Sequence, residues 1–176
     1  MASQIRIGIN GFGRIGRMVF RAAMARDDIE IVAVNDLLPI DHLAYLLKYD
    51  SVHGRFAGEI AAEAKALRID GRVVAAFEER EPGSIRWGDA GVDLVIDSTG
   101  RFLTEEQAGG HIRAGAAKVL LSAPPDDDPS RPAASIAALR PPMKRSIAFA
   151  MPSRAEATAP PRVSPHDFHA ASEAWR

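Results

Sequence analysis

The stretch Gln4–Ala25, QIRIGINGFGRIGRMVFRAAMA, decides the fold of this chain. Its first part, Gln4–Asn10, alternates apolar and polar side chains, which is the period of a β-strand. Apolar residues then recur at helical spacing from Ile15 to Ala25. Between the two lies Gly11–Gly16, GFGRIG, a G-x-G-x-x-G pattern. The stretch therefore predicts a strand, a tight glycine turn and a helix.

Each glycine of this turn has a mechanical reason. We expect Gly11 to make the tight turn, Gly13 to let the backbone approach a pyrophosphate, and Gly16 to allow close packing of helix on sheet. The helix N-terminus favours phosphate charge. Asp36 lies twenty residues after Gly16, at the end of the apolar stretch Ile29–Asn35, where a carboxylate accepts hydrogen bonds from ribose hydroxyls. The pattern predicts dinucleotide binding, and the alternative is a purely structural glycine turn.

Asp36 also bears on the choice of cofactor. A carboxylate at this position would repel a 2′-phosphate, and neither Leu37 nor Leu38 supplies a cation that would hold one. The sequence therefore favours NAD over NADP.

A short helix is expected after the second strand. Asp41 is predicted to cap it, and Leu43, Leu46 and Leu47 are predicted to share one face. Tyr45 and Tyr49, spaced four apart, are expected to pack in the core.

Further elements alternate along the rest of the pattern. Strands rich in Val and Ile that alternate with helices indicate a parallel sheet with covered faces, which is an α/β, Rossmann-type doubly wound and mostly parallel sheet. Its ligand should lie beyond the carboxyl ends of the strands. The predicted elements are a hairpin of Ala66–Ile69 and Arg72–Ala75 around the type I′ turn Asp70-Gly71, a strand at Val92–Asp97, a helix opened by a Thr104/Gln107 capping box and ended by Gly115, and a last strand at Lys118–Ser122.

Composition changes near Ala123. All 14 glycines lie at or before Gly115, whereas ten of the 12 prolines follow residue 123. Such a segment buries too little apolar surface to offset its ordering entropy. We therefore expect an NAD-binding domain at residues 1–122 and an Ala/Pro-rich, poorly ordered tail at residues 123–176.

The overall composition excludes several classes of protein. The formal net charge is −1 with 26% charged residues, which argues against a nucleic-acid partner. No apolar run is long enough to span a bilayer, so we expect a cytoplasmic protein without a membrane partner. The chain has no cysteine, which removes thiolate nucleophiles and thiolate metal ligands. His166 and His169 lack a third ligand, so no metal site is expected.

Five separated motifs are similar to the N-terminal half of phosphorylating glyceraldehyde-3-phosphate dehydrogenases. They match in order and spacing over about residues 3–124, and they are Asn10–Arg17 (NGFGRIGR), Asn35-Asp36, Leu47–Phe56 (LKYDSVHGRF), Asp97–Phe102 (DSTGRF) and Ser122–Pro124 (SAP). This resemblance implies NAD as cofactor, with Arg14 and Ile15 at the pyrophosphate turn and Asp36 on the ribose. It also implies Arg80 and the pair Thr99 and Phe102 on the adenine side, and Ser122 toward the nicotinamide end.

The resemblance stops where the family's chemistry begins. In this family a cysteine motif and then a catalytic domain follow this segment, and the whole protein forms a homotetramer. Here no cysteine follows Pro124. We therefore expect a chain that is truncated or frameshifted after about residue 124, binds NAD, carries no catalytic residue and is inactive alone. The alternative is a non-enzymatic NAD-binding or regulatory module that docks on a partner.

Overall fold

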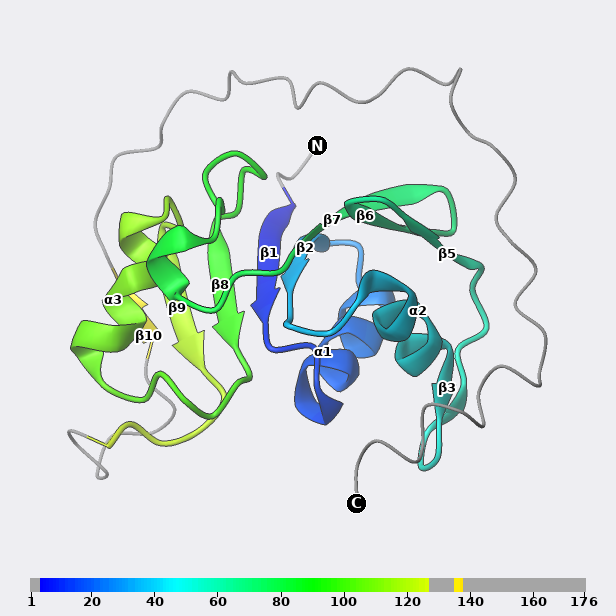
Figure 1. Ribbon diagram of the computed structural model, residues 1–176, viewed down its shortest axis with the longest axis horizontal. Coiled ribbons are helices and arrows are strands. Elements are labelled where there is room, and N and C mark those ends of the chain that lie inside the picture. The colour runs from blue at the N-terminus through cyan, green and yellow to red at the C-terminus, as the bar shows by residue number, and fades with distance from the viewer. Residues whose placement is uncertain (1–3, 127–134, 138–176) are drawn as a thin grey trace.

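The computed structural model describes residues 4–126 and 135–137, and they form one eight-stranded sheet with helices on both faces (Figure 1). The strand order is β10-β9-β8-β1-β2-β7-β6-β5. The strands are β1 (Ile5–Asn10), β2 (Ile29–Asn35), β5 (Ile60–Glu63), β6 (Ala66–Ile69), β7 (Arg72–Phe77), β8 (Leu94–Asp97), β9 (Lys118–Leu121) and β10 (Ser135–Ala137). The remaining elements are α1 (Arg14–Met24), α2 (Ile40–Lys48), α3 (Glu105–Arg113), the 3-10 turn η1 (Pro82–Ser84), and a small separate hairpin of β3 (Tyr49–Asp50) and β4 (Gly54–Arg55).

The centre of the sheet is parallel and both ends are antiparallel. Strands β9, β8, β1, β2 and β7 pair in parallel, and β10 at one end and β6 and β5 at the other pair antiparallel. This arrangement confirms the predicted doubly wound α/β fold. It also brings the carboxyl ends of β1, β2, β7 and β8 to one edge.

The central strand β2 contributes residues to two cores, one on each face of the sheet. Ile31 and Val34 belong to the core under α1 and α2, whereas Val32 and Ala33 belong to the core on the α3 side, around Trp87. Because both faces are covered, the strand is apolar almost throughout, as expected for a buried parallel strand. In Figure 1, α3 accordingly lies beside β9, while α1 and α2 lie beside the centre and the other half of the sheet.

Local signals in the sequence are confirmed. Asp70 (φ 48°) and Gly71 (φ 80°) both take the positive φ of a type I′ turn between β6 and β7. Thr104 accepts a hydrogen bond from the Gln107 backbone N–H and the Gln107 side chain accepts one from the Thr104 N–H, which completes the predicted capping box of α3.

Two expectations around α2 are wrong. Asp41 does not cap this helix, because α2 begins at Ile40 after Pro39 and Asp41 lies within the first turn. Tyr45 and Tyr49 are not core residues: 45% and 49% of their surfaces are exposed, and their rings pack on each other at 5.0 Å. The buried face of α2 is formed by Leu43 and Leu47, which leaves Tyr45 on the far side of the helix, and Tyr49 belongs to β3.

Three strand pairings were missed by the sequence interpretation. They are the β3–β4 hairpin, β5 against β6, and β10 against β9 in antiparallel register. Strand β10 lies beyond residue 122, inside the segment expected to be a poorly ordered tail. The boundary between a domain at 1–122 and a tail at 123–176 stays a prediction.

No helix in the described ranges is both long enough and apolar enough to cross a bilayer.

The glycine turn is a steric requirement of the packing between β1 and α1. Gly11 has φ +83°, and a Cβ at Gly16 would overlap the Gly11 carbonyl oxygen. Both observations agree with the predicted mechanical roles of these two glycines.

We expect Gly16→Ala to lower the free energy of unfolding by about 1–3 kcal/mol, since the added methyl group must displace the turn backbone. Gly13→Ala is the matched control, because a Cβ there meets no atom within 4 Å, and it should cost less, about 0.5–1 kcal/mol, since alanine is a poorer N-cap than glycine. Urea unfolding of the full chain measures both. Equal losses from the two variants would contradict the steric explanation.

Candidate functional site

A groove of about 250 Å³ lies where the carboxyl ends of the central strands meet. Six of the ten predicted cofactor residues line it, and they come from segments far apart in the chain. They are Gly11, Gly13, Asp36, Arg80, Thr99 and Phe102.

The other four predicted residues do not line this groove. Arg14 and Ile15 are exposed in the first turn of α1, and Gly16 is buried beneath the turn. Ser122 is exposed just after β9. Of the four, Gly16 has a clear structural task, which is the close packing of α1 on β1.

The start of α1 has the features of an anion site. Gly13 is its N-cap and no side chain caps the helix, so the first-turn N–H groups lack the partner that a capping side chain supplies. The space where a Gly13 side chain would lie is open. Backbone donors, a positive helix end and open space together suit a phosphate group.

Asp36 is tied to the glycine turn. One carboxylate oxygen accepts the Phe12 backbone N–H at 2.7 Å, and the other accepts the Leu38 N–H at 3.1 Å. The carboxylate is half-buried at the end of β2. Its position relative to the turn is therefore held by the chain itself, and its remaining lone pairs can accept further hydrogen bonds.

Two buried asparagines join the strand ends that border the groove. The Asn35 amide donates to Asn10 Oδ1 at 2.8 Å and to the Glu79 carbonyl at 2.9 Å, and Asn35 Oδ1 accepts the Glu79 N–H at 2.8 Å. Asn10 in turn donates to Asp97 Oδ2 at 2.9 Å. The ends of β1, β2 and β8 and the loop after β7 are thus linked by one chain of hydrogen bonds.

Asp97 is a buried carboxylate with a full set of donors. Its Oδ2 accepts from Asn10 Nδ2 and from His111 Nε2, and its Oδ1 accepts from the backbone N–H and the hydroxyl of Thr99. Burial by itself raises the pKa of Asp97, but the hydrogen bonds from His111, Thr99 and Asn10 outweigh it, so that the pKa lies below its usual value. Asp97 is therefore charged in the folded protein at neutral pH.

The Ser98 hydroxyl is a buried polar group that the chain leaves without a hydrogen-bond partner among the described residues. Ser98 also lines the groove. Because buried polar groups are nearly always satisfied, this hydroxyl fits a groove that holds a polar ligand. Together with the open space at Gly13, it indicates that the residues present suit a dinucleotide.

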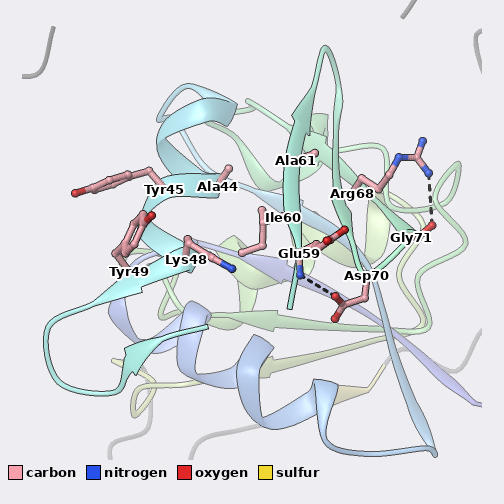
Figure 2. A pocket seen from close by; sticks show the side chains of 10 residues that line it. All are labelled: Ala44, Tyr45, Lys48, Tyr49, Glu59, Ile60, Ala61, Arg68, Asp70 and Gly71. Carbon is pink, nitrogen blue, oxygen red and sulfur yellow. Dashed lines mark hydrogen bonds between the residues drawn. The ribbon is translucent and has the colours of Figure 1, made fainter. Parts of the chain in front are cut away.

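A larger hollow of about 530 Å³ lies elsewhere, between α2 and the strands β5 and β6 (Figure 2). Three charged side chains that line it are already engaged: Lys48 donates to the Gly58 carbonyl, Arg68 pairs with Glu63, and Asp70 accepts the Glu59 N–H. The smaller groove, with its glycine turn and orphan hydroxyl, is the better candidate site.

Several lining residues were not predicted as site residues. They are Asn10, Asn35, Leu37, Glu79, Ser98 and Arg101. One signal could have found two of them: Asn10 and Asn35 are polar residues that each end a buried apolar strand, at the edge where ligands bind in such sheets.

No group of acidic, histidine or cysteine side chains that could hold a metal ion is found in residues 4–126. The His166 and His169 pair lies outside the described residues.

We expect Asp97→Asn to lower the free energy of unfolding by about 3–5 kcal/mol at neutral pH, because an amide cannot accept from all four donors. The pKa of Asp97 is lowered from its usual 3.8 in the folded protein, so its stabilisation is present above pH 3.8 and is lost as the pH falls further. The difference in free energy of unfolding between Asp97→Asn and the unsubstituted chain should therefore shrink below about pH 4. Urea unfolding across a pH series measures it.

Asp50→Asn is the control for this pH effect. The backbone N–H groups of His53 and Val52 lower the pKa of Asp50 to about 2, but this carboxylate lies on the β3–β4 turn, outside the groove network. At neutral pH, Asp50→Asn should lower the free energy of unfolding by less than Asp97→Asn does. A deficit of Asp97→Asn that stays constant down to pH 2 would contradict the assignment of a buried charge.

Comparison with known proteins agrees with this geometry. Residues 5–105, more than half of the chain, match the family described as glyceraldehyde 3-phosphate dehydrogenase, NAD binding domain. The chain is 53% identical over 124 residues to the cytosolic glyceraldehyde-3-phosphate dehydrogenase of Trypanosoma brucei brucei. It is 55% identical over 125 residues to a glyceraldehyde-3-phosphate dehydrogenase of Bacteroides fragilis, and 53% identical over 124 residues to glyceraldehyde-3-phosphate dehydrogenase A of Escherichia coli.

Each match covers 70% of this chain and 38% of the relative, so the chain spans less than two fifths of the length of these relatives. The family match includes the glycine turn, Asp36 and the groove-lining segments up to Phe102. NAD is the cofactor of this domain. The chain belongs to the glyceraldehyde 3-phosphate dehydrogenase family, as a member that carries its NAD-binding domain.

Proposed function

We propose that NAD binds along the groove, with its pyrophosphate at Gly11 and Gly13 and its adenosine ribose on Asp36. The observation that carries this proposal is the 2.7 Å hydrogen bond from the Phe12 N–H to Asp36, which holds the carboxylate beside the glycine turn. A dinucleotide needs both features at a fixed separation.

The adenine side is assigned to Arg80, Thr99 and Phe102. All three line the same groove as Asp36, and they come from the loop after β7 and the loop after β8. Arg80 offers a flat guanidinium group and Phe102 an aromatic ring, and both suit the face of a purine. The unpartnered Ser98 hydroxyl beside them would gain a partner from the ligand.

Three further assignments rest on the family resemblance. Arg14 and Ile15 would lie along the pyrophosphate from the first turn of α1, where their side chains are exposed. Ser122 would lie toward the nicotinamide end, at the carboxyl end of β9.

We expect the full chain to bind NAD more tightly than NADP, because the Asp36 charge opposes a 2′-phosphate. Asp36→Asn keeps an oxygen for the Phe12 N–H but removes this charge, so it should narrow the preference by about ten-fold, or about 1.4 kcal/mol. Calorimetry with both cofactors measures it.

Asp41→Asn is the matched control for Asp36→Asn. It removes the same charge from an exposed position on α2 and should leave the ratio of the two affinities unchanged. The assignment of Asp36 fails if the unsubstituted chain binds NAD and NADP equally.

For the whole protein we propose the activity by which its relatives are named, which is oxidation of glyceraldehyde 3-phosphate with NAD as hydride acceptor. We further propose a cytoplasmic location and no nucleic-acid or membrane partner, and we propose the family's homotetrameric assembly for the whole protein but not for this chain alone. The second candidate is a non-enzymatic NAD-binding or regulatory module that docks on a partner. It is favoured by one observation, which is the absence of cysteine from all 176 residues.

We expect the 176-residue chain alone to form no NADH from glyceraldehyde 3-phosphate, even when NAD is bound. The family's reaction begins with attack of a thiolate on the aldehyde, and this chain has no cysteine. Absorbance of NADH, measured on protein freed of host enzyme, checks this. Turnover that survives repurification and scales with the concentration of the chain would contradict it.

A further inference from the structure

His111 is a fully buried titratable residue that the proposed function does not use. It lies on α3, with none of its surface exposed, and its ring is placed between Trp87 and Asp97. Both ring nitrogens have partners: Trp87 Nε1 lies 2.9 Å from Nδ1, and Asp97 Oδ2 lies 2.9 Å from Nε2. His111 therefore joins two buried side chains, Trp87 and Asp97, by hydrogen bonds.

The partners determine the tautomer of His111. The indole N–H of Trp87 is a donor only, so Nδ1 must be free of hydrogen to accept it. The hydrogen of the neutral ring is then on Nε2, where it is donated to Asp97. The hydrogen bond from Trp87 thus selects the tautomer in which His111 Nε2–H donates to Asp97.

The effect of this donor reaches the wall of the groove. Asp97 Oδ2 receives His111 and Asn10 side by side, and this leaves Oδ1 directed at the Thr99 N–H (2.9 Å) and hydroxyl (2.6 Å). Thr99 lines the groove. The orientation of the carboxylate thus sets the orientation of the loop after β8.

A second contact places His111 behind the same wall. The Phe102 ring meets the imidazole edge to face at 6.5 Å, and Phe102 also lines the groove. The Trp87 ring also packs near the imidazole, with the two ring centroids 6.0 Å apart. In this dry surrounding the hydrogen bonds are strong, and an unpaired atom would be costly.

We propose that His111 is a positioning residue for the adenosine half of the cofactor groove: held by Trp87 with its hydrogen on Nε2, it orients Asp97, and through Asp97 it fixes Thr99 and Asn10. This inference rests on the proposed function for its consequence in binding. Its structural part, the order of the Thr99 loop, is independent of any cofactor.

Two substitutions separate positioning from packing. The amide nitrogen of glutamine corresponds to Nε2 of histidine, so His111→Gln can still donate to Asp97. The amide of asparagine corresponds to Nδ1, so His111→Asn is too short to reach Asp97. Both variants remove the ring and its packing. His42→Gln, at an exposed position of α2, is the control for loss of a histidine.

The variants are compared in the full chain with two readouts. Calorimetry should give NAD and ADP-ribose affinities about ten-fold weaker for His111→Asn, by the same factor for both ligands, and within about two-fold of the unsubstituted chain for His111→Gln. NMR hydrogen exchange without cofactor should show a faster-exchanging Thr99 amide in His111→Asn but not in His111→Gln.

A third measurement needs no variant and still applies if His111→Asn fails to fold. Nitrogen NMR of the imidazole in the unsubstituted chain should find the hydrogen of His111 on Nε2, and a hydrogen on Nδ1 would overturn the inference.

Equal effects of His111→Asn and His111→Gln on affinity and on Thr99 exchange would also overturn it, because His111 would then act by packing alone. If the unsubstituted chain binds no NAD, the proposed function fails, while the tautomer and the Thr99 exchange still decide the inference.

Discussion

The buried carboxylate of Asp97 is the constraint on which the groove depends. A charge with 2% of its surface exposed is destabilising unless every lone pair finds a donor, and the donors here come from β1, from α3 and from the loop after β8. These segments can satisfy Asp97 only in one mutual arrangement. The same arrangement brings Asn10 and Thr99 to the groove, so the shape of the candidate site follows from supplying hydrogen-bond donors to one buried charge.

The glycine turn imposes a second constraint that meets the first at Asn10. Gly11 and Gly16 allow α1 to start directly beneath the end of β1, and this places Phe12 where its N–H reaches Asp36. Asn10, one residue before the turn, joins Asn35 and Asp97. The glycine turn and the ends of β2 and β8 are therefore joined in one hydrogen-bonded frame.

Beyond the fold class, the details that the sequence predicted correctly are those with local causes. The Asp70-Gly71 turn, the Thr104/Gln107 capping box and the G-x-G-x-x-G turn each depend on residues within a few positions of one another. Tyr45 and Tyr49 were misplaced because helical spacing alone does not say which face is buried, and Leu43 and Leu47 form that face. The link between Asn10 and Asp97 joins residues 87 positions apart, and that between Trp87 and His111 joins residues 24 apart. The neighbours of these four residues in the sequence do not indicate which distant residue each one contacts.

All members of this frame lie between Asn10 and His111, within the described part of the chain. The hydrogen bonds that order this side of the groove are therefore made within this stretch. A groove that is already ordered binds with less loss of conformational entropy, which favours tight binding by few contacts. The groove frame is thus built into the ends of β1, β2 and β8, and it contains no thiolate, because the 176 residues include no cysteine.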